Sequence, residues 1–314
     1  MYNPPLGLGP VTTTYHPSVH RFAIFVVCWT ILLLVAGALV TSNEAALSVP
    51  DWPLSYGTLT PPMVGGIRFE HSHRVIAGVL GLLSIGLAVS VWAQDERRWL
   101  RWFSVIAVAG IAAQAVLGGE VVRQLLHYWL PVMHACFAQI VFAALLSIAV
   151  FTGRWWVSDQ PQVEDTGSPA IHSLAIANAA VTYFQVILGA GFRHKEIPVW
   201  PHMVGALIVL GMVIWLAAVL RKRFEKSAAI SKTRILLHAI LGTQLLLGLG
   251  AYWSRLTTAD APQPMPLMVT LTVLHTVVGA ILFGISILIV LLCYRLVPRR
   301  RELPAATQRP VAIS

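Results

Sequence analysis

The hydrophobic residues of this 314-residue chain occur in eight long blocks separated by short polar segments. Each block has about 20 residues, which is the length an α-helix needs to cross a hydrocarbon core of about 30 Å. The pattern predicts helices over 22–41, 71–93, 101–121, 130–151, 171–192, 200–220, 234–253 and 267–293. A β-barrel is excluded, because barrel strands alternate polar and apolar residues over about 10 positions and these blocks do not. The expected fold class is an all-α integral membrane protein with eight transmembrane helices.

Composition agrees with this pattern, since 57% of the residues are hydrophobic and only 11% are charged. A polar linker with Pro161 and Pro169 divides the helices into two pseudo-symmetric four-helix bundles. The predicted parts are an N-terminal arm (1–21), an N-terminal four-helix half (22–151), the linker (152–170), a C-terminal four-helix half (171–293) and a basic tail (294–314) that we expect to be disordered beyond Arg299.

The net charge of +9 does not indicate a nucleic-acid partner, because Lys and Arg lie in the gaps between apolar blocks rather than along one face. Sixteen of the 22 basic residues fall on the side that holds both termini. The positive-inside rule then predicts that both termini are cytoplasmic. Cys28, Cys136 and Cys293 all lie inside apolar blocks, where no disulfide of a water-exposed loop can form.

A repeat appears when equivalent helices are compared. The third, fifth and seventh predicted helices share Gln-x-x-Leu-Gly, at Gln114, Gln185 and Gln244, and the first keeps only Gly37 of it. The even-numbered helices each carry a histidine near the outward end, followed four residues later by a small residue: His73 and Ala77, His134 and Ala138, His202 and Ala206, His275 and Gly279. Residues four apart share one helix face.

Histidine inside a membrane span is costly and marks a functional site by default. Four histidines at one depth, each with a small residue beside it, fit axial ligands of haem, and they suggest two bis-histidine sites: His73 with His134, and His202 with His275. The plainer alternative is that the histidines only reach the membrane interface. A mononuclear metal site is disfavoured, because no Cys, Asp or Glu lies at the matching depth in the fourth, sixth or eighth helix.

The two halves differ around their histidines. Glu70 stands three residues before His73, whereas Trp200 and Pro201 precede His202 without an acid. One site would then perform chemistry, with Glu70 as a general base or as a stabiliser of positive charge, and the other would transfer electrons. The alternative is that Glu70 only pairs with Arg74 at i+4.

Three further residues keep two interpretations each. His71 could replace His73 as a ligand or point into the preceding loop. Arg74 and Arg123 could bind haem propionates, because a guanidinium suits carboxylates, or could anchor the helices at the membrane interface.

These motifs together closely resemble the haem A synthase family over residues 22–293. The likeness rests on Gly37-Ala-Leu-Val-Thr41, on Leu47-Ser-Val-Pro-Asp-Trp-Pro53, on Glu70-x-x-His73-Arg74, on the Gln-x-x-Leu-Gly repeats, and on the histidines of the fourth, sixth and eighth helices. Many bacterial members have a cysteine pair in the first outward loop. This chain has Val49 and Ser55 there, so a thiol role in that loop does not apply.

The resemblance implies an oxidoreductase of a bacterial cytoplasmic (inner) membrane that converts the C8 methyl of haem O to a formyl group through hydroxylated intermediates, with water supplying the oxygen. It implies a haem b cofactor on His202 and His275, the substrate haem O on His73 and His134, and a catalytic Glu70. The implied partners are the lipid bilayer, a protohaem farnesyltransferase and oxidase assembly proteins. A homo-oligomer stays open.

Two other function classes compete. A non-catalytic dihaem b-type cytochrome exchanging electrons with a quinone needs the four histidines but neither Glu70 nor the Pro-Asp-Trp-Pro loop. A transporter with an internal repeat would use the histidines as a proton relay. Broken helices near mid-membrane would favour transport, yet these histidines lie at one end of their helices and the helix interiors hold few prolines.

Overall fold

The computed structural model describes residues 14–165 and 167–298 of the chain. The tail beyond Arg299, which we expect to be disordered, lies outside these ranges. The described part contains helices and no strands: α1 (Pro17–Ser42), α2 (Ile67–Gln94), α3 (Arg98–Arg123), α4 (Leu130–Thr152), the single turn α5 (Arg154–Val157), α6 (Ile171–Arg193), α7 (Val199–Phe224), α8 (Ala228–Thr257) and α9 (Pro266–Leu296). All except α5 are long and apolar enough to cross a membrane. The predicted all-α membrane fold is confirmed.

Several helices begin earlier than the apolar blocks do. α1 begins at Pro17 rather than at 22, α2 at Ile67 rather than at 71, and α8 at Ala228 rather than at 234. The apolar pattern ends where the side chains meet water, but the backbone hydrogen bonds continue for another turn. Proline in the first turn starts α1 and α9, where its missing N–H has no helical partner to lose. As a result Glu70 lies within α2 rather than in the loop.

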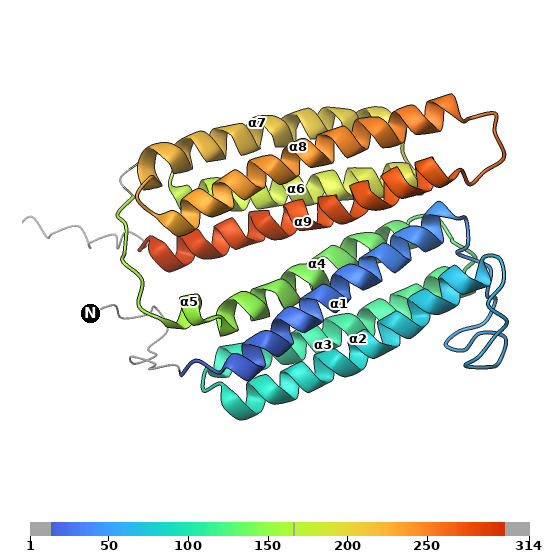
Figure 1. The fold of residues 1–314 in the computed structure, drawn as a ribbon, viewed down its shortest axis with the longest axis horizontal. Coiled ribbons are helices and arrows are strands. Elements are labelled where there is room, and N and C mark those ends of the chain that lie inside the picture. Colours follow the sequence, from blue (N-terminus) through green and yellow to red (C-terminus); the bar gives the residue numbers. More distant parts are fainter. Residues whose placement is uncertain (1–13, 166, 299–314) are drawn as a thin grey trace, which may run out of the picture.

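The eight long helices run side by side, with α1 to α4 forming one group and α6 to α9 the other (Figure 1). Leu87, Leu100 and Leu145 are in the core of the first group, and Leu216 and Leu237 are in that of the second. The groups meet where α1 and α4 contact α9: Ala38 packs on Val273 and Val277, and Gly284 allows α9 to approach Phe142 and Leu146. Small residues allow such close approach between membrane helices.

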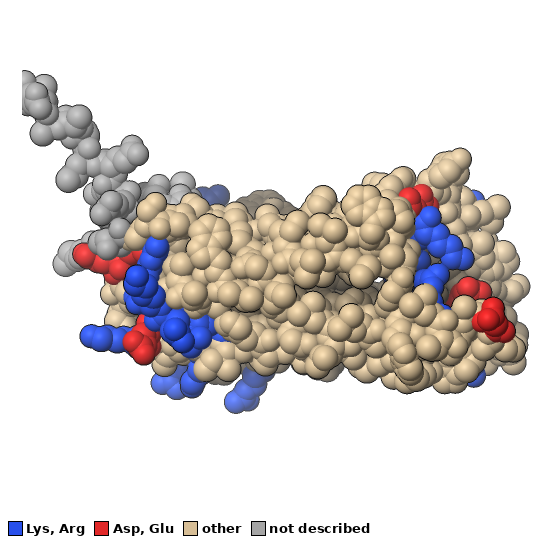
Figure 2. Space-filling view, turned by 90° about the horizontal axis from the view of Figure 1, so that it is seen from above, with Lys and Arg blue, Asp and Glu red and all other residues tan. Residues whose placement is uncertain are grey.

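The molecule has two different ends. α1 begins and α9 ends at one of them, called here the terminal end, and the connections 43–66, 124–129, 194–198 and 258–265 lie at the other, called here the loop end (Figure 1). Figure 2 shows the charged side chains gathered at both ends, with an uncharged band between them. Cys28, Cys136 and Cys293 are free thiols.

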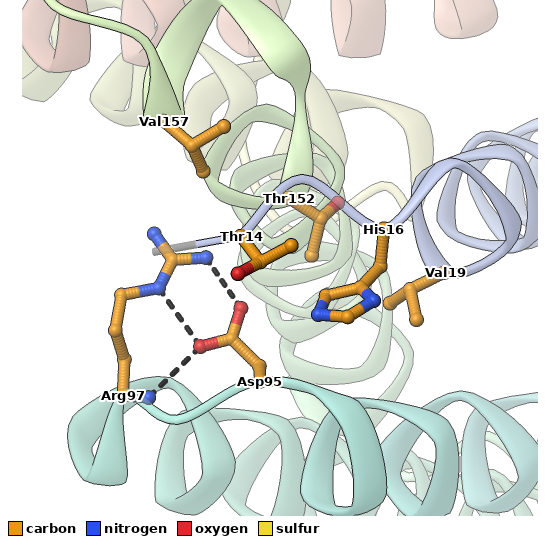
Figure 3. Close-up of a pocket in the computed structure, with 7 residues that line it drawn as sticks. All are labelled: Thr14, His16, Val19, Asp95, Arg97, Thr152 and Val157. Carbon is orange, nitrogen blue, oxygen red and sulfur yellow. Dashed lines mark hydrogen bonds and ion pairs between the residues drawn. The ribbon is translucent and has the colours of Figure 1, made fainter. Parts of the chain in front are cut away.

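A buried ion pair closes the terminal end between α2 and α3. The Arg97 guanidinium donates to both carboxylate oxygens of Asp95, at 2.9 and 2.6 Å, and to the carbonyl oxygen of Phe151 at 2.9 Å. Thr14, His16 and Thr152 line the small cavity beside it (Figure 3). Only 5% of Asp95 and 8% of Arg97 are exposed, so the pair ties the α2–α3 turn to the end of α4.

Candidate functional site

The four predicted ligand histidines lie near the loop end, each close to the start of its helix: His73 in α2, His134 in α4, His202 in α7 and His275 in α9. Each ring is half-buried and packs with its Cε1 edge on a glycine of the preceding helix. A Cβ atom added to that glycine would lie 3.1 Å from Cε1 for Gly37 and His73, 3.0 Å for Gly118 and His134, 2.9 Å for Gly189 and His202, and 2.8 Å for Gly248 and His275. We call these four contacts the glycine sockets. A side chain at Gly189 or Gly248 would force the ring to shift, and one at Gly37 or Gly118 would make a contact tighter than most that real Cβ atoms make.

In the C-terminal half, glutamine side chains and backbone hold the rings. His275 Nδ1 lies 3.1 Å from the Gln244 carbonyl oxygen, which can only accept, so Nδ1 is the donor. This leaves Nε2 unprotonated, as a metal ligand must be. Gln185 Nε2 donates to the His202 carbonyl oxygen at 2.8 Å and lies 3.0 Å from His202 Nδ1.

The N-terminal pair has fewer such bonds. Gln114 Nε2 donates to the His134 carbonyl oxygen at 2.9 Å, but α1 carries Leu33 where the other helices carry the glutamine. Nδ1 of His73 and Nδ1 of His134 are buried and make no hydrogen bond of normal geometry among the described residues, although the His73 ring lies near the Leu33 backbone and the His134 ring near the Gln114 backbone. The two halves therefore share the sockets and differ in the hydrogen bonds that support the rings.

The structure brings together the two predicted pairs of histidines. The His202 and His275 ring centroids are 6.1 Å apart, and their planes are perpendicular at 89°. A ring nitrogen about 2 Å from a metal puts the ring centroid about 3 Å from it, so two rings on opposite sides stand about 6 Å apart. His73 and His134 lie within electrostatic range of each other. Figure 2 shows a hollow in the uncharged band toward this same end.

Glu70 and Arg74 hold the loop 43–66 onto α2. Arg74 Nη2 lies 2.6 Å from Glu70 Oε1, and Arg74 Nη1 donates to the carbonyl oxygens of Asp51 and Leu54 at 2.6 and 2.5 Å. The other carboxylate oxygen of Glu70 accepts the Val49 N–H at 2.9 Å. The i+4 ion pair thus exists, and Glu70, 4% exposed, is a fixed carboxylate one helical turn from His73.

The remaining ambiguous residues also contact protein groups. His71 Nδ1 lies 2.9 Å from Ser55 Oγ, so His71 points into the loop. Arg123 pairs with Glu120 and stands 5.5 Å from the centroid of the Trp52 ring. This ring packs on α3, where a Cβ atom at Gly119 would lie 2.7 Å from Trp52 Cδ2.

Asp51 shapes the loop itself. Its carboxylate accepts the N–H groups of Tyr56 and Gly57 at 2.7 and 2.8 Å. These bonds, the Gly57 N–H first, hold the pKa of Asp51 below its ordinary value of 3.8. The Pro-Asp-Trp-Pro motif therefore provides one turn-forming acid and one ring that packs on α3 beside the His134 socket.

Two contacts escaped the sequence interpretation. One feature of the sequence pointed to the contact between Trp52 and Gly119, namely that glycines 118 and 119 are consecutive. Gly118 makes room for the His134 ring, and Gly119 makes room for the Trp52 ring of the loop. Arg193 at the end of α6 donates to the Ala38 carbonyl oxygen and to Ser42 Oγ of α1, at 3.0 and 2.7 Å. No spacing in the sequence connects these two helices.

Comparisons with known proteins agree with this geometry. Residues 67–205 match the family model described as cytochrome oxidase assembly protein. A haem A synthase of Lysinibacillus sphaericus is 25% identical over 304 residues, covering 87% of this chain and 92% of the relative. This chain is thus similar over most of its length to a protein named haem A synthase.

Two other relatives with that name align over a shorter stretch. The protein of Symbiobacterium thermophilum is 31% identical over 194 residues, which is 57% of this chain and 61% of the relative. That of Shouchella clausii is 28% identical over 188 residues, 58% of this chain and 61% of the relative. These relatives make haem the group to test against the histidine pairs. The sockets and the ring separation in the C-terminal pair are compatible with it.

Proposed function

We propose that this chain is a haem A synthase, which oxidises the C8 methyl group of haem O to a formyl group by successive hydroxylations. The substrate haem O binds between His73 and His134, and haem b binds between His202 and His275. The observation that carries the proposal is that both halves hold a pair of socketed histidines, but only the first pair has a buried carboxylate, Glu70, beside it.

The residues of the substrate half have distinct roles. Converting a methyl to a hydroxymethyl group with water releases two protons and two electrons, and Glu70 is the carboxylate positioned to accept a proton. Arg74 and the Val49 N–H orient that carboxylate, and Trp52 holds the loop against α3. Haem b, when bound, would carry the two electrons one at a time to a one-electron acceptor outside the chain.

The cellular setting belongs to the same proposal. The protein lies in the cytoplasmic membrane of a bacterium, with the terminal end inside, because most basic residues lie at that end. It receives haem O from a protohaem farnesyltransferase and delivers its product to oxidase assembly proteins.

Expression in a host that makes haem O but no haem A tests the function. We expect wild-type protein to yield haem A or its hydroxylated intermediate, identified by chromatography and mass. Glu70→Gln should lower the yield at least about 100-fold, within the range that a general base contributes. If Glu70 acted only through its ion pair, Arg74→Gln would cause the same loss. We expect Arg74→Gln to retain more activity.

Two haem b per chain with no oxidised product would instead indicate the electron-transfer cytochrome.

A further inference from the structure

Two arginines lie at the loop end of the C-terminal half, Arg193 at the end of α6 and Arg255 near the end of α8. Arg193 uses Nη2 for its two bonds to α1, while no described residue accepts from its Nη1 or Nε. The Arg255 guanidinium carbon is 5.5 Å from the centroid of the Phe192 ring. Both guanidinium groups therefore retain free N–H donors.

Neither arginine has a carboxylate partner in the described ranges. The ion pairs found there are Glu70 with Arg74, Asp95 with Arg97, Glu120 with Arg123, and Asp165 with Arg223. Arg193 is half-buried, whereas Arg255 is exposed. A half-buried guanidinium without an anion has an uncompensated desolvation penalty, which here falls on Arg193. The location of such a group therefore indicates where an anionic ligand would be stabilised.

The position of these charges relates them to the histidine pair. Arg193 follows Gly189 by four residues on α6, one helical turn from the glycine on which the His202 ring packs, and Arg255 follows Gly248 by seven residues on α8, two turns from the glycine on which the His275 ring packs. A haem between His202 and His275 carries two propionate carboxylates, which must reach the polar edge of the membrane. Two guanidinium groups at that edge match two carboxylates in number and charge.

The N-terminal half differs, because its arginine without a carboxylate partner at the loop end, Arg68, is exposed and stands 4.7 Å from the centroid of the Phe69 ring. Arg74 is occupied by Glu70 and by carbonyl oxygens of the loop, and Arg123 is paired with Glu120. The two arginines that the sequence suggested for propionates are therefore already bound to protein groups.

We propose, building on the proposed function, that Arg193 and Arg255 bind the propionates of the haem held by His202 and His275 and make it the resident cofactor. At its loop end the N-terminal half offers no half-buried guanidinium without a carboxylate, so its haem dissociates more readily, as a substrate and product must. The difference between a resident haem and an exchanging haem thus comes from the arginines as well as from the residues around the histidine ligands.

The test measures haem loss from the purified full-length protein in detergent to an excess of apomyoglobin, followed by absorbance. Losing one charge-assisted hydrogen bond of about 1.5–3 kcal/mol should speed dissociation of the C-terminal haem at least about tenfold in Arg193→Gln and in Arg255→Gln. Arg123→Gln, the matched control in the other half, should change that rate less than about twofold. Unchanged rates in both of the first two variants would overturn the proposal.

Two further variants separate charge from packing. Ser42→Ala removes one of the two bonds between Arg193 and α1 without changing charge, and the bond to the Ala38 carbonyl oxygen remains, so we expect no faster haem loss. Faster loss in Ser42→Ala together with a normal rate in Arg255→Gln would assign the effect to helix packing and contradict the proposal. Wild-type protein that holds a low-spin haem but makes no haem A would refute the enzyme function and leave the propionate test standing. Wild-type protein without haem would overturn both.

Discussion

Single glycines set where the histidine rings lie. In all four sockets the missing Cβ atom allows the imidazole of the next helix to approach the backbone, and the same geometry recurs in both halves. Glutamine adds a second support in three sockets, whereas α1 has Leu33 at that position. A ligand held by packing and by a hydrogen bond has a fixed ring orientation, which tunes the metal it binds.

Gly248→Ala should displace His275. The new methyl would lie 2.8 Å from the ring, and overpacking of this kind costs about 1–3 kcal/mol. We expect less low-spin haem per chain and a lower melting temperature, measured by absorbance and by thermal unfolding in detergent. Gly242→Ala on the same helix meets nothing within 4 Å and should leave both values unchanged. Equal effects of the two substitutions would refute the socket.

At the scale of elements, charged groups hold the loop 43–66 in place. Arg74 of α2 donates to a carbonyl oxygen of the loop, and the Asp51 carboxylate accepts an N–H group within the loop itself. The helices extend beyond their apolar blocks because backbone hydrogen bonding does not stop at the membrane boundary. This extension brings Glu70 into the first turn of α2, where its carboxylate reaches the backbone of the loop.

The loop should depend on the charge of Asp51. Because its pKa is lowered on folding, the Asp51 contribution to loop stability is complete above its ordinary pKa of 3.8 and is lost as the pH falls below it. Amide exchange over 51–58 should show protection that persists from pH 8 to pH 5 and declines only in stronger acid. Asp51→Asn should reduce protection at neutral pH. Full protection in that variant would contradict this account of the turn.

The ion pair at the terminal end should be a major stabilising contact. Removing one partner of a buried pair leaves an uncompensated charge and costs about 3–5 kcal/mol. Asp95→Asn should therefore lower the melting temperature in detergent clearly more than Glu120→Gln does, since the Glu120–Arg123 pair is partly exposed and contributes about 0–1 kcal/mol. A smaller effect for Asp95→Asn than for Glu120→Gln would contradict the role of Asp95.

At the scale of the whole molecule, the sequence predicts what depends on local pattern. Helix number and the depth of His73, His134, His202 and His275 follow from hydropathy and spacing, and the pairing of equivalent helices follows from the repeat. The contact of Trp52 with Gly119 and that of Arg193 with Ser42 join residues far apart in the chain, so no local pattern encodes them. The direction of His71 likewise depends on how the loop folds back.

The orientation in the membrane stays a prediction that reporter fusions test. Sixteen of the 22 basic residues lie on the side of the termini, so a fluorescent protein fused after Ser314 should mature in the cytoplasm. Alkaline phosphatase inserted in the connection 258–265 should be active, because that segment should face the periplasm. The reverse pattern would place the loop end, and with it Glu70, inside the cell.

We propose that the N-terminal half holds the substrate haem and the C-terminal half holds haem b. Identifying the haems that remain in histidine variants tests this assignment most directly. The wild-type chain, His73→Ala and His275→Ala would be purified from a host that makes haem b and haem O, and their haems extracted for chromatography and mass. We expect that His73→Ala keeps haem b and makes no haem A, and that His275→Ala loses haem b. Loss of haem b from His73→Ala, or its full retention by His275→Ala, would contradict it.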